Sequence, residues 1–181
     1  MGFFWQNKQF EQTLNLHWQR LYRQAYAWCH DPQLAGDLVQ ETLSRSCRRP
    51  YQFENDKALG VWLYKVMNNC WRDHHRQQRE MVPLDEMHMV TESGPDLSLA
   101  QQQLQHTVQQ AMAQLKADHR QIITLIDMEE FSYTEVAEIL DIPTGTVMSR
   151  LSRGRQQLKL ILEKTSPSLA AGGTTIRSIK P

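Results

Sequence analysis

The 181-residue sequence has no excess of charge of either sign, because its 20 Lys and Arg residues balance 20 Asp and Glu residues. A protein that binds DNA by itself through many phosphate contacts is usually more basic, since each contact needs a cation. The chain as a whole is therefore not a polycation. If its partner is DNA, either the basic residues gather on particular surfaces or another protein shares the binding.

Long apolar runs are also absent. No stretch reaches the roughly 18 consecutive apolar residues of a membrane-spanning helix. The opening MGFFWQNKQF lacks the basic leader and long apolar run of a signal peptide. Cys29, Cys47 and Cys70 are odd in number and show no C-x-x-C spacing, which argues against a disulfide framework or a zinc ribbon. We therefore expect a cytoplasmic protein with reduced, buried cysteines.

The usual signatures of enzymes are missing too. The sequence contains no Gly-rich phosphate loop, no nucleophile elbow and no paired catalytic carboxylates, so we expect neither a catalytic site nor a small-molecule substrate. No run of useful length alternates with the period of a strand, whereas apolar residues recur at helical spacing along most of the chain. The pattern predicts an all-α fold.

Composition divides this all-α chain into two small helical domains. Between Glu80 and Ser98 several acidic residues meet no Lys or Arg, and Pro83, Gly94 and Pro95 interrupt any helix, which indicates a flexible acidic linker. We predict a first domain at 10–79, the linker at 80–98, a second domain at 99–164 and a frayed tail at 165–181.

Apolar stripes predict the helices of the first domain. The first stripe comprises Leu14, Trp18, Leu21, Ala25 and Trp28. Asp31-Pro32 then opens a second helix, whose inner side consists of Leu34, Leu38 and Thr42. After a loop, a third helix is expected to begin near Ala58.

The third predicted helix contains WLYKVMNNCWRDHHRQQR and has two unlike faces. Its apolar face consists of Leu59, Trp62, Leu63, Val66, Met67 and Cys70. Its far face carries amides and cations: Lys65, Asn68, Arg72, Arg76 and Arg79, with Asn69 at the edge. Such a face suits phosphate contact and base stacking on opened DNA. The preceding loop, with Tyr51, Phe53 and Asn55, could hold an unstacked base.

A metal or redox module is the alternative for the same helix. Cys70 and His74 have the i, i+4 spacing of a ligand pair. His75 points about 100° away from His74, and the third nearby donor, Asp73, also points elsewhere. We therefore expect no metal ligand set on this helix.

The second domain contains FSYTEVAEILDIPTGTVMSRLSRGRQQL, which has the order of a helix-turn-helix. Ser132 and Glu135 form a capping box, Pro143 ends the short helix, and Thr144 is expected to cap the next one. The side of this second helix away from its apolar stripe, with its flanks and core edge, consists of Thr146, Met148, Ser149, Arg150, Ser152, Arg153 and Gln156. Small hydroxyls with an outward arginine favour a helix in the major groove over a solvated basic helix.

Three segments taken in order resemble a known family: DLVQETLSR, WLYKVMNNCWRDHHR and SYTEVAEILDIPTGTVMSRLSRGRQQL. They are similar to the signatures of a bacterial sigma-70 family factor, within the extracytoplasmic function (ECF) group that keeps only sigma regions 2 and 4. The resemblance covers residues 10–163. It implies an alternative sigma factor that binds core RNA polymerase and directs it to promoter DNA.

The resemblance also implies roles for particular residues. Docking on core polymerase would use Asp37, Gln40, Glu41 and Arg45. Recognition and melting of the −10 element would use Tyr51, Phe53, Asn55, Lys65, Asn68, Asn69, Arg72 and Arg76. The −35 element would be read by the outward face of the second helix of the helix-turn-helix, and the linker would thread near the RNA path of the polymerase. A cognate anti-sigma factor, in some systems membrane-bound, is a further expected partner.

The chain departs from the family pattern at four positions. Lys116 stands where proline is usual, Asp141 where glycine is common, and Gly154 where alanine is common. Met148 stands where many members have a basic residue, which puts one −35 contact in doubt. A self-sufficient helix-turn-helix regulator is the alternative function. It would need a ligand pocket or a dimerisation seam in the first domain, to which the basic amide face is poorly suited.

Overall fold

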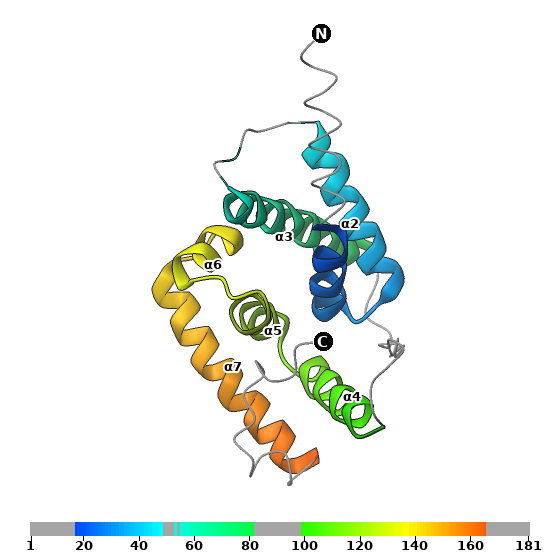
Figure 1. The fold of residues 1–181 in the computed structure, drawn as a ribbon, viewed down its shortest axis with the longest axis vertical. Coiled ribbons are helices and arrows are strands. Elements are labelled where there is room, and N and C mark those ends of the chain that lie inside the picture. Colours follow the sequence, from blue (N-terminus) through cyan, green and yellow to red (C-terminus); the bar gives the residue numbers. More distant parts are fainter. Residues whose placement is uncertain (1–16, 49–52, 54, 82–98, 166–181) are drawn as a thin grey trace. The chain divides into compact units, whose positions relative to one another are not determined.

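The computed structural model describes residues 17–48, 53, 55–81 and 99–165, and every regular element among them is a helix (Figure 1). The predicted all-α fold is confirmed over these residues. The chain divides into two compact units between His88 and Met89, apart from residues 138–141, which group with the first unit. Tyr51, nearly all of the predicted linker and nearly all of the predicted tail lie outside the described residues.

The described part of the first unit consists of a helix over residues 17–29, α2 (Pro32–Cys47) and α3 (Asp56–Met81). A sharp turn joins the first two, since His30 has a left-handed backbone with φ 54°. Asp31 caps α2 as predicted: its Oδ1 accepts hydrogen bonds from the backbone N–H groups of Gln33 at 2.8 Å and Leu34 at 3.1 Å. Pro32 fits the first position of α2 because no bond from its nitrogen is required there.

The core of the first unit lies between the three helices, where α2 packs on α3. It contains Leu21, Ala25, Trp28, Ala35, Leu38, Val39, Thr42, Leu59, Leu63, Met67, Cys70 and Trp71. The predicted inner position of Trp18 is wrong, because this residue is 42 % exposed and stacks on Tyr22 with ring centroids 5.1 Å apart. Its neighbour His17 is buried instead, and Nε2 of His17 lies 2.9 Å from Oδ1 of Asp56.

Helix α3 begins at Asp56, two residues before the predicted start. Asn55 acts as its cap, since the Asn55 side-chain oxygen accepts a hydrogen bond from the backbone N–H of Ala58 at 2.8 Å. The prediction located the first apolar periodic residues correctly but missed the polar cap before them.

The second unit contains α4 (Leu99–Ala113), α5 (Ala117–Ile123), a π-helical turn (Thr124–Met128), α6 (Tyr133–Leu140) except its residues 138–140, and α7 (Thr144–Thr165). Helices α4 and α5 both pack on α7, the long helix of this unit (Figure 1). The buried apolar side chains include Ile122, Ile123, Leu125, Val136, Val147, Leu151 and Leu158. The predicted stripe of α7 is confirmed at Val147, Leu151 and Leu158.

Capping groups define the start and end of α6. The backbone N–H of Ser132 donates to Oε2 of Glu135 at 2.7 Å, and the backbone N–H of Glu135 approaches Oγ of Ser132 at 3.3 Å, so the predicted capping box is confirmed. At the other end, Asp141 has φ 56° and the Ile142 N–H donates to the Ala137 carbonyl at 3.1 Å. This left-handed helix ending favours glycine, which explains why glycine is common at this position in the family that the sequence resembles.

Helix α7 begins one residue earlier than predicted. Thr144 is its first residue rather than its cap, because the carbonyl of Pro143 already accepts the backbone N–H of Val147 at 3.2 Å. Farther along, Gly154 marks a close approach of α5 to α7. A Cβ atom at this position would lie 3.0 Å from Cδ1 of Ile123 and 3.1 Å from Cβ of His119. The glycine therefore has a packing role within the second unit.

Candidate polymerase and nucleic-acid interfaces

The outward face of α2 carries the polar residues predicted to contact polymerase. Asp37, Gln40 and Glu41 are exposed, and Arg45 is partly exposed. Asp37 and Gln40 line a surface hollow together with Trp18, Pro32, Gln33, Gly36 and Leu43. Periodicity alone missed Trp18 as a surface residue, because a tryptophan at helical spacing counts as apolar whichever way it points.

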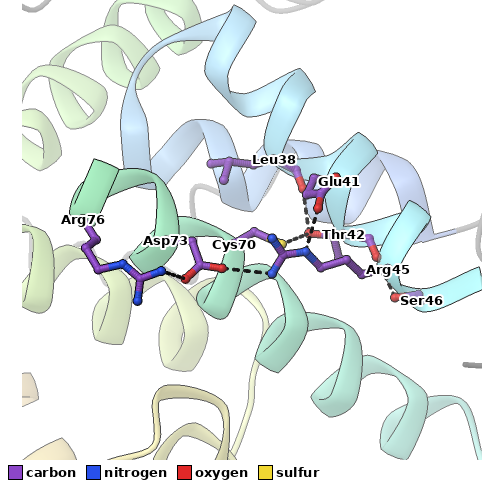
Figure 2. Close-up of polar contacts among 8 residues, drawn as sticks. All are labelled: Leu38, Glu41, Thr42, Arg45, Ser46, Cys70, Asp73 and Arg76. Atoms are coloured by element: carbon purple, nitrogen blue, oxygen red, sulfur yellow. Dashed lines mark hydrogen bonds and ion pairs between the residues drawn. The ribbon is translucent and has the colours of Figure 1, made fainter. Parts of the chain in front are cut away.

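Arg45 connects α2 to α3 (Figure 2). Its Nε donates to Oε1 of Glu41 at 2.7 Å, and its Nη1 donates to Oδ2 of Asp73 at 3.0 Å. Arg76 approaches the other oxygen of Asp73 at 3.4 Å. Hydrogen bonds with Glu41 and Asp73 raise the pKa of Arg45 above its ordinary value, so this guanidinium stays charged. Two of the four predicted docking residues thus pair with each other, and Arg45 also bridges α2 and α3.

Beside this ion-pair network, small side chains lie at the contact between the two helices (Figure 2). The Thr42 hydroxyl donates to the Leu38 carbonyl at 2.6 Å and lies 3.9 Å from Sγ of Cys70. Ser46 similarly donates to the carbonyl of Thr42 at 2.7 Å. Burial raises the pKa of the Cys70 thiol, with Arg45 and Thr42 acting in the opposite direction. Cys70 is therefore a neutral, packed thiol at neutral pH.

The neighbours of Cys70 on α3 are occupied by other contacts. Asp73 holds Arg45 and Arg76, and the ring of His75 packs edge-on against Trp71 at a centroid distance of 4.0 Å. His74 stacks on Trp71 at 6.4 Å. Among the residues with described positions, no group of three or more His, Cys, Asp or Glu side chains could hold a metal ion.

Most residues of the predicted −10 face are available on the surface of α3. Asn69, Arg72 and Arg76 are exposed and Lys65 is partly exposed, so these side chains share one helix with their polar ends accessible. Asn68 differs, because it is buried in the structure. A contact between Asn68 and a base would first require its side chain to become uncovered.

Two aromatic side chains lie at the start of α3. Phe53 packs against Trp62 with ring centroids 5.1 Å apart and planes tilted by 45°. Trp62 is only partly buried, although its place in the apolar stripe predicted a core residue. Asn55, a predicted DNA contact, uses its side-chain oxygen to cap α3. The structure thus brings Phe53 next to Trp62, an aromatic that the sequence did not assign to the site.

The outward face of α7 is continuous over its first half. Its exposed members are Gly145, Met148, Ser149, Ser152, Arg153 and Gln156. They recur at steps of three and four along the helix, so they form one ridge. Thr146 and Arg150, which were also predicted to contact the −35 element, are partly buried at its sides.

Two other arginines of α7 form ion pairs within the second unit. Nη1 of Arg150 lies 3.0 Å from Oδ2 of Asp118 on α5. Arg155 makes two contacts with Asp127 of the π-helical turn, one of them between Nε and Oδ2 at 3.2 Å. The hydrogen bond with Asp127 raises the pKa of Arg155. Arg153 is the arginine of this segment that points outward from the ridge.

The geometry defines a class of protein: two helical units, of which the second carries a helix-turn-helix with a polar, arginine-bearing outer ridge. Family comparison agrees with this class. The model described as sigma-70 region 2 matches residues 14–81, and the model described as sigma-70 region 4 matches residues 105–158.

Curated relatives and solved structures give the same result. The chain is 27% identical to the ECF RNA polymerase sigma factor SigW of Bacillus subtilis over 162 residues, which span 83% of this chain and 87% of the relative. It is 30% identical to the ECF RNA polymerase sigma-E factor of Salmonella typhimurium, over 67% of this chain and 70% of that protein. The sigma factor RpoE of Bartonella quintana, solved in complex with the anti-sigma factor NepR, superposes with a TM-score of 0.69 at 27% identity, covering 86% and 98% of the two chains.

The chain belongs to the ECF group of the sigma-70 family. It is a transcription initiation factor, an alternative sigma factor that directs promoter-specific transcription. This membership confirms the resemblance seen in the sequence and favours it over a self-sufficient regulator. No helix among the described residues is long and apolar enough to cross a membrane.

Proposed function

We propose that the outward face of α2 docks on core RNA polymerase. The observation that carries this assignment is the surface hollow in which exposed Asp37 and Gln40 meet the exposed indole of Trp18. Tryptophan and well-placed polar groups are typical of the few residues that dominate binding energy at protein interfaces. Asp37 and Gln40 are both exposed, so both are accessible to a partner.

The exposed cations of α3 would contact the −10 element and help to open it. Arg72 and Arg76 can meet phosphates of a single strand, while Phe53 and Trp62 offer an aromatic surface at the start of the same helix. Cations beside aromatics suit single-stranded DNA because bases stack on rings while the backbone meets positive charge. Tyr51 and Asn55 would belong to the same site through the preceding loop, with Lys65, Asn68 and Asn69 along the helix.

The ridge of α7 would read the −35 element as a duplex. A recognition helix presents the residues of its N-terminal part to base edges in the major groove. In α7 that part holds Ser149, Ser152 and Arg153, of which Ser152 and Arg153 can donate hydrogen bonds to bases or phosphates. In this proposal the domain at 10–79 contacts the −10 element and the domain at 99–164 contacts the −35 element. The acidic linker at 80–98 joins the two domains.

The partners of the protein would then be core polymerase, promoter DNA and a cognate anti-sigma factor, in the cytoplasm where polymerase works. The anti-sigma factor would compete for the α2 face, and its attachment to a membrane would fit a response to signals from outside the cytoplasm. The protein itself would have no enzymatic activity, because the polymerase carries out the chemistry. A formal net charge of zero fits this sharing of DNA contacts with polymerase.

Run-off transcription with purified core polymerase tests the assignment. Genomic fragments serve as templates and this protein is the only sigma factor present. We expect discrete transcripts with the protein and none with core polymerase alone. In parallel, promoter binding by the free protein should be weak and nonspecific. Tight, sequence-specific binding that is equal with and without polymerase would contradict the shared-binding model and support a self-sufficient regulator.

A further inference from the structure

The ridge of α7 contains one large apolar side chain in the part assigned to base contact. Met148 is 53 % exposed, in the second turn of a helix that begins at Thr144. Its neighbours on the ridge are Gly145, Ser149 and Ser152, which are small. The thioether chain therefore projects beyond the surface around it.

Hydrogen-bond donors are scarce around Met148. The Ser149 hydroxyl donates back to the carbonyl of Thr146 at 3.1 Å. Arg150 is engaged with Asp118 at 3.0 Å, and Gly145 has no side chain. The first outward polar groups that can donate to a base are Ser152 and Arg153, a turn or more farther along the helix. The first two turns of the ridge thus present an apolar contact rather than a polar one.

The major groove offers one apolar group that differs between base pairs, the 5-methyl group of thymine. We infer that Met148 reads the 5-methyl group of a thymine in the −35 element. This inference rests on the assignment of α7 to that element. It replaces the electrostatic contact of family members that carry a basic residue here with a contact that distinguishes an A·T pair through its methyl group.

Arg153 adds a second base preference to this contact. Met148 and Arg153 are both exposed, but they lie at opposite edges of the ridge, about 140° apart around the helix axis. An arginine in the major groove most often pairs with the O6 and N7 atoms of guanine. The −35 element should therefore contain a guanine as well as the thymine that Met148 contacts.

Replacing thymine by deoxyuridine removes the methyl group and leaves base pairing unchanged. The full-length protein with core polymerase is bound to a promoter found by run-off transcription, and each −35 thymine on both strands is replaced in turn. We expect one position at which deoxyuridine weakens closed-complex formation about three- to five-fold, the effect of burying about one methyl group. With Met148→Ala the same replacement should have no effect, and with Met148→Leu the discrimination should persist.

Leu160→Ala is the matched control, because Leu160 is equally exposed at 52 % on the same helix but lies beyond the segment assigned to base contact. It should keep the full deoxyuridine effect. Three results overturn the inference: a contacted stretch without thymine, no deoxyuridine-sensitive position, or a sensitivity that Met148→Ala leaves intact. Each is distinct from failure of the proposed function, in which scrambling the whole −35 element leaves polymerase binding unchanged.

Discussion

Arginine–carboxylate pairs connect helices in both units, but in different surroundings. In the first unit, Arg45 links α2 to α3 through Asp73, and both side chains are more than a third exposed. In the second unit, Arg155 links α7 to the π-helical turn through Asp127, whose side chain is only 6 % exposed. The two pairs have similar chemistry, yet only the second encloses a charge within the protein.

This difference in exposure indicates which arginines are available for binding a partner and which stabilise the fold. Screening by solvent makes an exposed pair nearly neutral for stability, so Arg45 and Glu41 can exchange their partner for polymerase at little cost. A buried carboxylate that loses its partner is strongly destabilising, because the remaining charge stays out of water. Arg155 is therefore needed to stabilise the fold, and we expect the neighbouring Arg153 to make the contacts with DNA.

The largest expected effect tests the enclosed pair. Arg155→Met should lower the free energy of unfolding by about 2–3 kcal/mol, because it leaves the Asp127 carboxylate buried without its cation. This loss of stability is at or below the usual range for a buried pair, because the Arg155 side chain is 49 % exposed. Urea unfolding followed by circular dichroism measures it. Asp127→Asn combined with Arg155→Met should recover part of the loss, and Arg153→Met serves as the matched control with unchanged stability.

Docking on polymerase should lose about 2 kcal/mol, or about 30-fold in affinity, in the double variant Asp37→Ala with Gln40→Ala. Stability should change by less than about 0.5 kcal/mol because both residues are exposed. A pull-down with core polymerase and a thermal melt measure the two quantities. An anti-sigma factor that covers the same face should lose affinity as well. If the double variant keeps its melting temperature and binds polymerase normally, the α2 face is not the dock.

The third prediction compares Arg76 of α3 with Arg153 of α7. Each substitution by alanine should weaken transcription by about 1–2 kcal/mol in activation free energy, in the range of single DNA contacts. Arg76→Ala should mainly impair melting, whereas Arg153→Ala should impair closed-complex formation on the duplex. A template with a pre-opened bubble across the −10 element should rescue Arg76→Ala more than Arg153→Ala. Equal rescue of the two variants would show that the faces are assigned wrongly.

The smallest effect is expected from the exposed pair. Arg45→Met should change the free energy of unfolding by no more than about 1 kcal/mol, since solvent screens the contacts with Glu41 and Asp73. Urea unfolding beside Arg155→Met measures the contrast directly. A loss of stability as large as that of Arg155→Met would contradict the expected difference between the exposed pair and the enclosed pair. A loss of polymerase binding at unchanged stability would instead assign Arg45 to the interface.

The sequence located most helices because local rules decide them. Asp31-Pro32 begins α2 and the Ser132–Glu135 box begins α6, since a helix end needs a partner for its backbone N–H groups and nearby side chains supply it. The ordered motifs also determined the family. Errors of one or two residues, as at Asn55 and Pro143, arose where the capping group is a backbone carbonyl or an amide in a loop.

Tertiary structure decided whether residues at the edge of an apolar stripe face the core or the solvent. It also decided which charged side chains form ion pairs. Periodicity assigned Trp18 to the core, whereas in the structure its neighbour His17 is buried and pairs with Asp56, 39 residues away in sequence. Periodicity placed Arg153 on the outward side of α7 and Arg150 and Arg155 nearer its core edge, but it did not identify the carboxylates that pair with them. Their roles diverge because Asp118 and Asp127, distant in sequence, pair with two of them and leave the third on the ridge. Contacts over such separations depend on how helices pack, and that packing is not encoded in any single helix.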